Sequence, residues 1–188
     1  GSAEIVANLA EMMRRQMGRM VHLIDDLLDI ARINTGKIAL QPERISLLPV
    51  LHEAIESSRP IIDRLGHRFN FNADEADLVL TGDPHRLSQI VSNLLSNAAK
   101  YTPSPGLIEM EVSRIGDQAR IVVRDNGEGI APAAQERIFG LFQQVNPDRQ
   151  DGLGIGLTLV RNLVELHQGS ISVVSEGEGR GSEFTVIL

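Results

Sequence analysis

The stretch SNLLSNAAKYTP, residues 92–103, decides the fold of this chain. It ends a helix that we expect over residues 83–101, because Asp83 can cap the first turn. Within that helix Asn93 and Asn97 stand one turn apart, although asparagine costs about 0.7 kcal/mol against alanine in a helix interior. A helix that carries both amides on one side calls for an explanation other than helix stability.

The two sides of this helix differ in polarity. Asparagine offers an amide oxygen that suits Mg²⁺ and an N–H donor that suits a phosphate oxygen. Lys100 could neutralise a terminal phosphate, and Tyr101 could pack against a flat base. The alternative is a solvated helix face with no ligand. The polar stripe, whose spacing places it on one side, consists of Arg86, Gln89, Asn93, Asn97 and Lys100; the apolar side consists of Leu87, Ile90, Val91, Leu94, Leu95 and Ala98.

An acidic residue ends a predicted strand over residues 119–125. The alternation places Asp125 on the same face as Ile121 and Val123, where an unpartnered carboxylate is costly. The glycine-containing loop 126–130 follows at once, and its glycines allow close backbone approach. Such a carboxylate could accept a hydrogen bond from an exocyclic amine, for example that of adenine. The alternative is a β-turn with an aspartate cap.

A second glycine loop, residues 151–157, opens a predicted helix that reaches Leu166. Gly152, Gly154 and Gly156 alternate there, and the free N–H groups at a helix N-terminus can cradle phosphate. The spacing matches neither the Rossmann nor the Walker fingerprint. The polar residues 143–151 before it predict a mobile lid over a bound ligand, or else an ordinary surface loop.

Helices and hairpin-linked strands are mixed in the chain without regular βαβ alternation. We therefore expect the α+β class, a two-layer sandwich of a mixed, mostly antiparallel sheet with helices on one face. Further helices are expected over 49–65, 132–139 and 153–167. Strands and extended pieces are expected over 38–40, 44–46, 68–72, 78–81, 107–114, 119–125, 170–175 and 182–188.

A long amphipathic helix is expected over residues 4–33, with glycine ending it at position 36. Its seam follows a heptad pattern, which favours a bundle or a homodimer over packing along its own domain. We expect two domains, a partial dimerisation helix in residues 1–40 and a second domain in residues 41–188. The seam residues are Met13, Met17, Met20, Ile24, Leu27 and Ala31.

Composition excludes several classes of function. The 188 residues carry a net charge of −7, which argues against a nucleic-acid partner, and no cysteine, which excludes disulfides and thiol catalysis. No run of about 18 apolar residues indicates a membrane span. We expect a cytoplasmic location, although a parent protein could be anchored in a membrane. The opening Gly1-Ser2 resembles a tag remnant, which predicts a piece of a longer protein.

Five motifs in order resemble the ATP-binding domain of sensor histidine kinases, in the superfamily that includes gyrase, heat-shock chaperones and mismatch-repair ATPases. Residues 20–32 also resemble the second helix of the kinase dimerisation bundle. The resemblance implies the Bergerat-type ATP-binding fold. The motifs are the N box at 93–101, the G1 box at 125–130, the F box at 139–142, the G2 box at 152–157 and the closing glycine motif at 179–185.

The resemblance implies ATP and Mg²⁺ as cofactors and assigns roles to individual residues. Asn93 would ligate Mg²⁺, and Asn97 would hold phosphate or the metal. Lys100 would contact phosphate, and Tyr101 would line the adenine site. Asp125 would bind the adenine amine, with Thr185 nearby. The remaining implied nucleotide contacts are Gly127, Gly129, Ile130, Gly152, Leu153, Gly154 and Gly156.

The resemblance implies transfer of the ATP γ-phosphoryl group to a histidine on the first bundle helix, and then to an aspartate of a response regulator. That histidine motif is missing here, because His22 is followed by Leu23 and not by an acid. We therefore expect that this fragment lacks the first helix and cannot phosphorylate itself. Two alternatives stay open: a clamp ATPase of the same superfamily, and a nucleotide-binding or dimerisation module without turnover.

Overall fold

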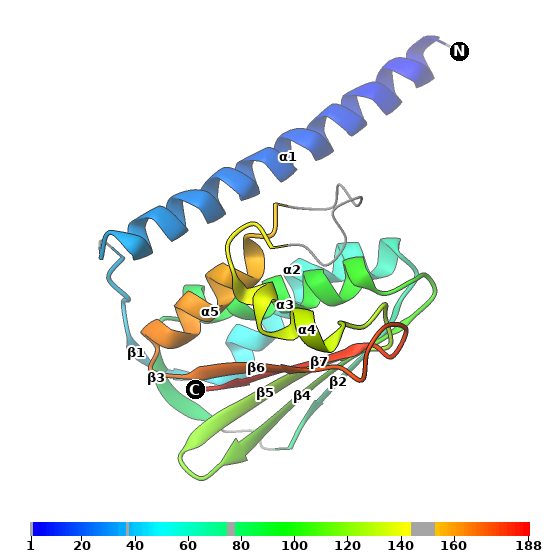
Figure 1. The fold of residues 1–188 in the computed structure, drawn as a ribbon. Helices are drawn as coiled ribbons and strands as arrows, with labels where there is room; N and C mark the ends of the chain where they lie inside the picture. The colour runs from blue at the N-terminus through cyan, green and yellow to red at the C-terminus, as the bar shows by residue number, and fades with distance from the viewer. Residues whose placement is uncertain (1, 37, 75–77, 144–152) are drawn as a thin grey trace. The chain divides into compact units, whose positions relative to one another are not determined.

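The computed structural model describes residues 2–36, 38–74, 78–143 and 153–188. The chain divides into two compact units, residues 1–38 and 39–188. The first unit contains one helix, α1 (Ser2–Asn34), drawn in blue in Figure 1. Many apolar side chains of α1 are exposed, including Met13, Met17 and Met20 at 59–67%. No helix within the described residues has the length and apolarity needed to cross a membrane.

The second unit is an α+β sandwich. Its five-stranded sheet has the order β2 (Arg68–Ala73), β4 (Leu107–Ile115), β5 (Gln118–Asp125), β7 (Ser182–Ile187), β6 (Ser170–Val174). The β2–β4 pair is parallel and the other pairs are antiparallel, so the sheet is mixed and mostly antiparallel. A separate two-stranded sheet pairs β1 (Glu43–Ser46) with β3 (Val79–Gly82).

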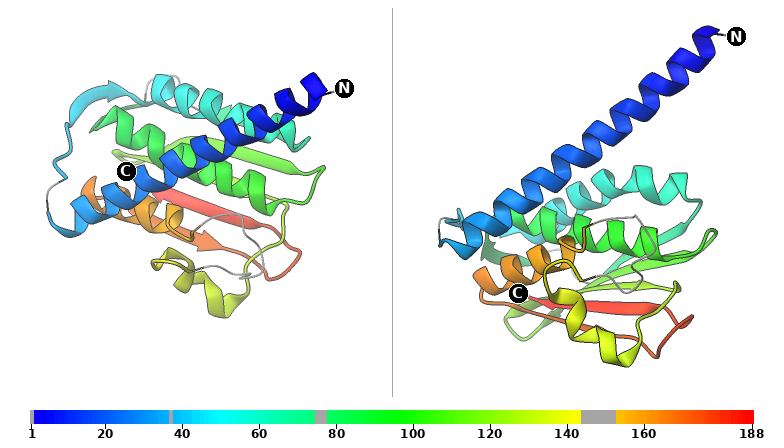
Figure 2. Two further views of the ribbon diagram at one scale, coloured as in Figure 1. Left: turned by 90° about the horizontal axis from the view of Figure 1, so that it is seen from above. Right: turned by 45° about the horizontal axis from the view of Figure 1, so that its top comes forward.

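Three helices cover one face of the large sheet, as Figures 1 and 2 show: α2 (Leu47–Arg64), α3 (Pro84–Tyr101) and α5 (Gly156–Leu166). The core lies between these layers. In α3 it includes Ile90, Leu94 and Leu95, each no more than 1% exposed, which are residues of the predicted apolar side. Asp83 caps α3 as expected, because its carboxylate accepts from the backbone N–H of Arg86 (3.2 Å).

Two of the expected helices differ clearly from the structure. The helix expected over 132–139 is broken into α4 (Pro132–Gln135) and a 3₁₀ turn, η1 (Arg137–Phe139). The helix expected from residue 153 begins at Gly156, because Gly154 adopts a left-handed conformation with φ +67° that no α-helix accommodates. The segment before α5 is therefore a turn rather than a first helical turn.

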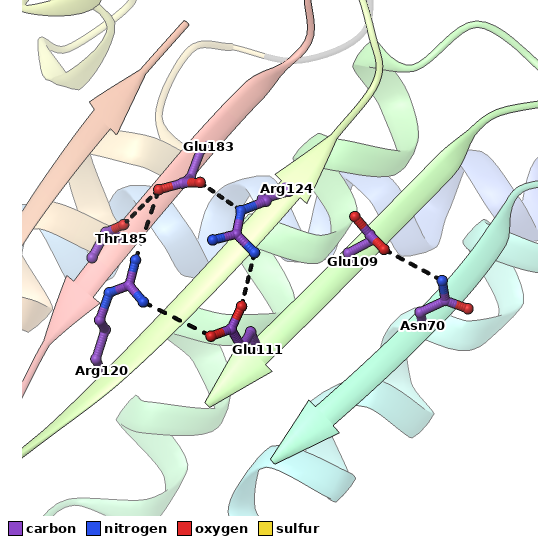
Figure 3. Close-up of polar contacts among 7 residues, drawn as sticks. All are labelled: Asn70, Glu109, Glu111, Arg120, Arg124, Glu183 and Thr185. Atoms are coloured by element: carbon purple, nitrogen blue, oxygen red, sulfur yellow. Dashed lines mark hydrogen bonds and ion pairs between the residues drawn. The ribbon is translucent and has the colours of Figure 1, made fainter. Parts of the chain in front are cut away.

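The described elements of residues 39–188 leave the other face of the sheet uncovered (Figure 1), and ion pairs lie on it. Arg124 donates to Glu183 (2.5 Å) and Glu111 (2.8 Å), as Figure 3 shows. The hydrogen bond to Glu111 raises the pKa of Arg124 and lowers that of Glu111. Val122 sits between Glu111 and Thr185 in the strand register and is 1% exposed. The charged side chains therefore shield an apolar position of this face.

Candidate functional site

A pocket opens where α3, the end of β5 and the start of α5 meet. Its volume, including the open mouth, is about 590 Å³. Both layers of the sandwich contribute to it, since helix residues supply one side and strand ends supply the other. It is lined by Asn97, Ala98, Tyr101, Asp125, Glu128, Gly129, Ile130, Ile138, Gln143, Leu157, Ser182 and Phe184.

Asp125 is held by two hydrogen bonds at the edge of this pocket. Its Oδ2 accepts from the hydroxyl of Ser182 (2.5 Å), and its Oδ1 accepts from the backbone N–H of Gly127 (2.8 Å). Burial raises the pKa of Asp125 above its ordinary value of 3.8, although both hydrogen bonds oppose the shift. The acid at the end of the apolar strand face is thus partnered, and it remains in contact with the pocket.

The two asparagines of α3 lie at different points of the same region. Asn97 lines the pocket. Asn93 lies one turn earlier and faces the first residue of α5, because a Cβ added at Gly156 would sit 3.0 Å from its Oδ1. The Nδ2 of Asn93 donates to the carbonyl of Gln89 (3.1 Å), so the amide oxygen is the atom directed at the α5 N-terminus. Lys100 is half-buried and is not among the lining residues.

Close backbone packing explains the glycines of the two loops. A Cβ at Gly127 would lie 2.4 Å from the Tyr101 carbonyl oxygen and 2.7 Å from Asp125 Oδ1. Gly154 packs on the backbone of Gln143, with 2.5 Å from an added Cβ to its carbonyl oxygen. Larger residues would displace the backbone at both positions.

Thr185 is not brought to the pocket. It lies on the open face of the sheet, where its hydroxyl contacts Glu183 (3.5 Å; Figure 3), whereas Asp125 lies on the helix-covered face. Ser182 is the hydroxyl residue beside Asp125, and the two are direct partners in the β5–β7 register. Because residues an odd number of positions apart along a strand lie on opposite faces, only one of Ser182 and Thr185 can share the face of Asp125, and the β5–β7 register determines which.

Several predicted features lie outside the described residues. These are Gly152, the expected lid over 143–151 apart from Gln143, and the side chain of His22. Gln143 lines the pocket, and Leu153 is 43% exposed. The residues that sequence reasoning missed are chiefly apolar: Ile138, Leu157 and Phe184 complete the walls.

Comparison with known proteins identifies the family. The model of the "Histidine kinase-, DNA gyrase B-, and HSP90-like ATPase" family matches residues 82–188. This chain therefore belongs to that ATPase family, and the matched range contains the whole pocket.

Two relatives of this chain are named histidine kinases. The chain is 38% identical over 173 residues to the circadian input-output histidine kinase CikA of Synechococcus elongatus, covering 89% of this chain and 23% of CikA. It is 36% identical over 186 residues to the sensor histidine kinase RcsC of Escherichia coli, covering 96% of this chain and 19% of RcsC. The chain thus spans about a fifth of the length of these relatives, and they favour the kinase hypothesis over the clamp ATPase.

Solved structures agree with this relationship. Full-length ShkA, solved in complex with AMPPNP, superposes with a TM-score of 0.81 at 28% identity, covering 96% of this chain and 38% of ShkA. The mycobacterial sensor histidine kinase MprB superposes with a TM-score of 0.69 at 26% identity, covering 78% of this chain and 96% of the MprB chain.

Proposed function

We propose that the pocket binds MgATP and that the chain is the catalytic, ATP-binding part of a sensor histidine kinase. The observation that carries this proposal is the presence of Asn97, Tyr101 and Asp125 in one pocket of a member of this ATPase family. An amide, an aromatic ring and a fixed carboxylate together suit a phosphorylated purine. The AMPPNP in the ShkA complex supports the same ligand class.

In this proposal the base occupies the strand end of the pocket. Asp125 accepts a hydrogen bond from the exocyclic amine, while Ser182 and the Gly127 N–H hold its carboxylate in position. Tyr101 and Ile130 supply surfaces against which a flat base can pack. The triphosphate then extends toward α3 and the N-terminus of α5, whose N–H groups favour anions.

The donor set near α5 fits Mg²⁺, which prefers oxygen ligands and is usually shared between protein and phosphates. The Asn93 amide oxygen, directed at Gly156, is the protein ligand that we propose. Mg²⁺ would neutralise charge on the phosphates during transfer. Asn97 and Lys100 would hold phosphate oxygens, so the contribution of this chain is chiefly placement and charge neutralisation.

The acceptor and the further partners follow from the class of protein. We propose that a histidine on the first bundle helix of the parent protein receives the γ-phosphoryl group and passes it to an aspartate of a response regulator, in the cytoplasm. The exposed apolar side chains of α1 would pair two copies of the parent. Sedimentation analysis of this chain should show a dimer, and a monomer would contradict that pairing.

Phosphoryl transfer provides the test of this function. Radiolabelled ATP should label a separately added first-helix fragment that carries the acceptor histidine, and it should not label this chain alone. Label on this chain without the fragment, or steady hydrolysis with no acceptor present, would refute the assignment in favour of another acceptor or a plain ATPase.

Asn93→Ala should abolish the Mg²⁺-dependent part of ATP affinity. We expect about a tenfold or greater loss in the presence of Mg²⁺ and little change in EDTA, because the substitution removes a proposed metal ligand and leaves the base contacts in place. Calorimetric titration measures both values. Asn72→Ala, at an exposed position of β2, is the control. An equal loss with and without Mg²⁺ would contradict the metal role.

Acidification should weaken binding through Asp125. Its raised pKa means that the carboxyl takes up a proton at a higher pH than an exposed aspartate does, and that proton occupies an oxygen needed as an acceptor. Because the pKa of Asp125 is raised in the folded chain, the folded chain binds this proton more tightly than the unfolded chain does. Protonation of Asp125 therefore stabilises the fold fully below pH 3.8, the ordinary pKa of the group, and this stabilisation is lost as pH rises through the raised pKa. Titration with adenosine, which has no titrating phosphate, should show affinity that decreases as pH is lowered; affinity that increases as pH is lowered would exclude this role.

A further inference from the structure

Two loops at the base end of the pocket are held together along their backbones. Loop A comprises residues 126–130 after β5, and loop B comprises residues 175–181 between β6 and β7. The N–H of Gly179 donates to the Glu128 carbonyl (2.6 Å), and the N–H of Gly181 donates to the Gly127 carbonyl (3.1 Å). Loop A supplies three lining residues of the pocket, Glu128, Gly129 and Ile130.

One side chain, Ser175, joins the two loops at the point where loop B begins. Its hydroxyl oxygen accepts from the backbone N–H of Ile130 (2.9 Å), and the hydroxyl donates to the carbonyl of Gly181 (2.7 Å). The N–H of Gly177 also points to this oxygen (3.3 Å). Ser175 thus satisfies backbone groups in both loops. Ile130 lines the pocket, and Gly181 immediately precedes Ser182, the partner of Asp125.

Gln135 of α4 makes a second bridge between the same two segments. Its Nε2 donates to the carbonyl of Ser175 (2.7 Å) and to the carbonyl of Ile130 (3.2 Å). The backbone of Ile130 is therefore fixed on both its N–H side and its carbonyl side. Ser175 and Gln135 are both half-buried, and neither lines the pocket.

We propose that Ser175 and Gln135 are positioning residues that set the geometry of the base end of the pocket. This inference rests on the proposed function, because it assigns a purpose to contacts around the site that binds adenine. They act through Ile130 on one wall and through Gly181 and Ser182 on the carboxylate. Without them the two loops keep only their backbone contacts, and a smaller fraction of molecules has the arrangement that accepts the base.

Loss of Ser175 or Gln135 should affect recognition of the base and not recognition of the phosphates. Affinity decreases in proportion to the fraction of molecules in the binding-competent arrangement. The phosphate end of the pocket, at α3 and the N-terminus of α5, has no contact with Ser175 or Gln135 among the hydrogen bonds of the described residues. Loosening the loops should therefore reduce the preference for adenine over guanine, since guanine presents a carbonyl where adenine presents its amine.

The test compares ATP and GTP affinities of the full chain and its variants by calorimetry, at a temperature where circular dichroism shows each variant folded. Ser175→Ala should weaken ATP binding about tenfold and leave GTP binding nearly unchanged, so that the ATP/GTP preference decreases about tenfold. Gln135→Ala should act in the same direction. Ser172→Ala, on an exposed position of β6, is the matched control and should change neither affinity.

The outcomes separate this inference from the proposed function. An unmodified chain that does not bind ATP would refute both. An unmodified chain that binds ATP, with Ser175→Ala and Gln135→Ala binding equally well, would refute the positioning role alone. An equal loss for ATP and GTP in both variants would also overturn it, because a general effect on the fold would then explain the result.

Discussion

Asp125→Asn is expected to weaken ATP binding at least about a hundredfold, the largest effect on affinity that we predict. The carboxylate accepts from Ser182 and from the Gly127 N–H, so its orientation toward the pocket is fixed before any ligand arrives. An asparagine of the same shape can place an N–H₂ donor where the base amine needs an acceptor. Two donors would then face each other in a half-buried site, which is costly. Calorimetric titration with ATP measures the loss.

Folding should not explain that loss. Burial raises the pKa of Asp125, so the folded chain on balance disfavours the charged form, and a neutral residue of equal size should fold at least as well at neutral pH. Asp117→Asn, in the exposed turn between β4 and β5, is the matched control and should bind ATP normally. Full ATP affinity in a folded Asp125→Asn variant would remove Asp125 from the site.

Gly129→Ala is expected to have the largest effect on stability. Gly129 has φ +69°, and a Cβ there would lie 2.0 Å from the carbonyl oxygen of Gly177. The substitution combines left-handed strain with a collision between the two loops, which should cost about 2–4 kcal/mol of unfolding free energy. ATP binding should also weaken, because Gly129 lines the pocket. Urea denaturation measures the first effect.

Gly116→Ala separates the two causes. Gly116 has nearly the same backbone conformation, φ +60°, but nothing lies within 4 Å of an added Cβ. It should therefore cost only the conformational strain, about 1 kcal/mol. If both substitutions lowered the free energy of unfolding by the same amount, the close approach of Gly129 to Gly177 would have no energetic importance.

The parts of the fold predicted correctly from sequence depend on local rules. The alternation along β5 placed Asp125 on the face of Ile121 and Val123, and those two residues are 1% exposed. The helical spacing around Asn93 and Asn97 placed both amides on one side of α3, and the cap at Asp83 marked where that helix begins. Hydrophobic periodicity and helix capping depend on residues that are close together in the sequence, so the sequence alone predicts them.

What sequence did not predict depends on residues distant along the chain. The sequence-based prediction named Thr185 and not Ser182, because only the β5–β7 register determines which hydroxyl meets Asp125. The Ser175 bridge joins loops 45 positions apart and has no local signature. The break between α4 and η1, and the late start of α5, likewise reflect backbone geometry that helix propensity does not encode.

The most direct measurement is the structure of this chain bound to a non-hydrolysable ATP analogue and Mg²⁺. We expect the base amine within hydrogen-bonding distance of Asp125, with the phosphates directed toward Asn93 and the N-terminus of α5. A nucleotide bound elsewhere on the molecule, or a base in this pocket that makes no contact with Asp125, would contradict it.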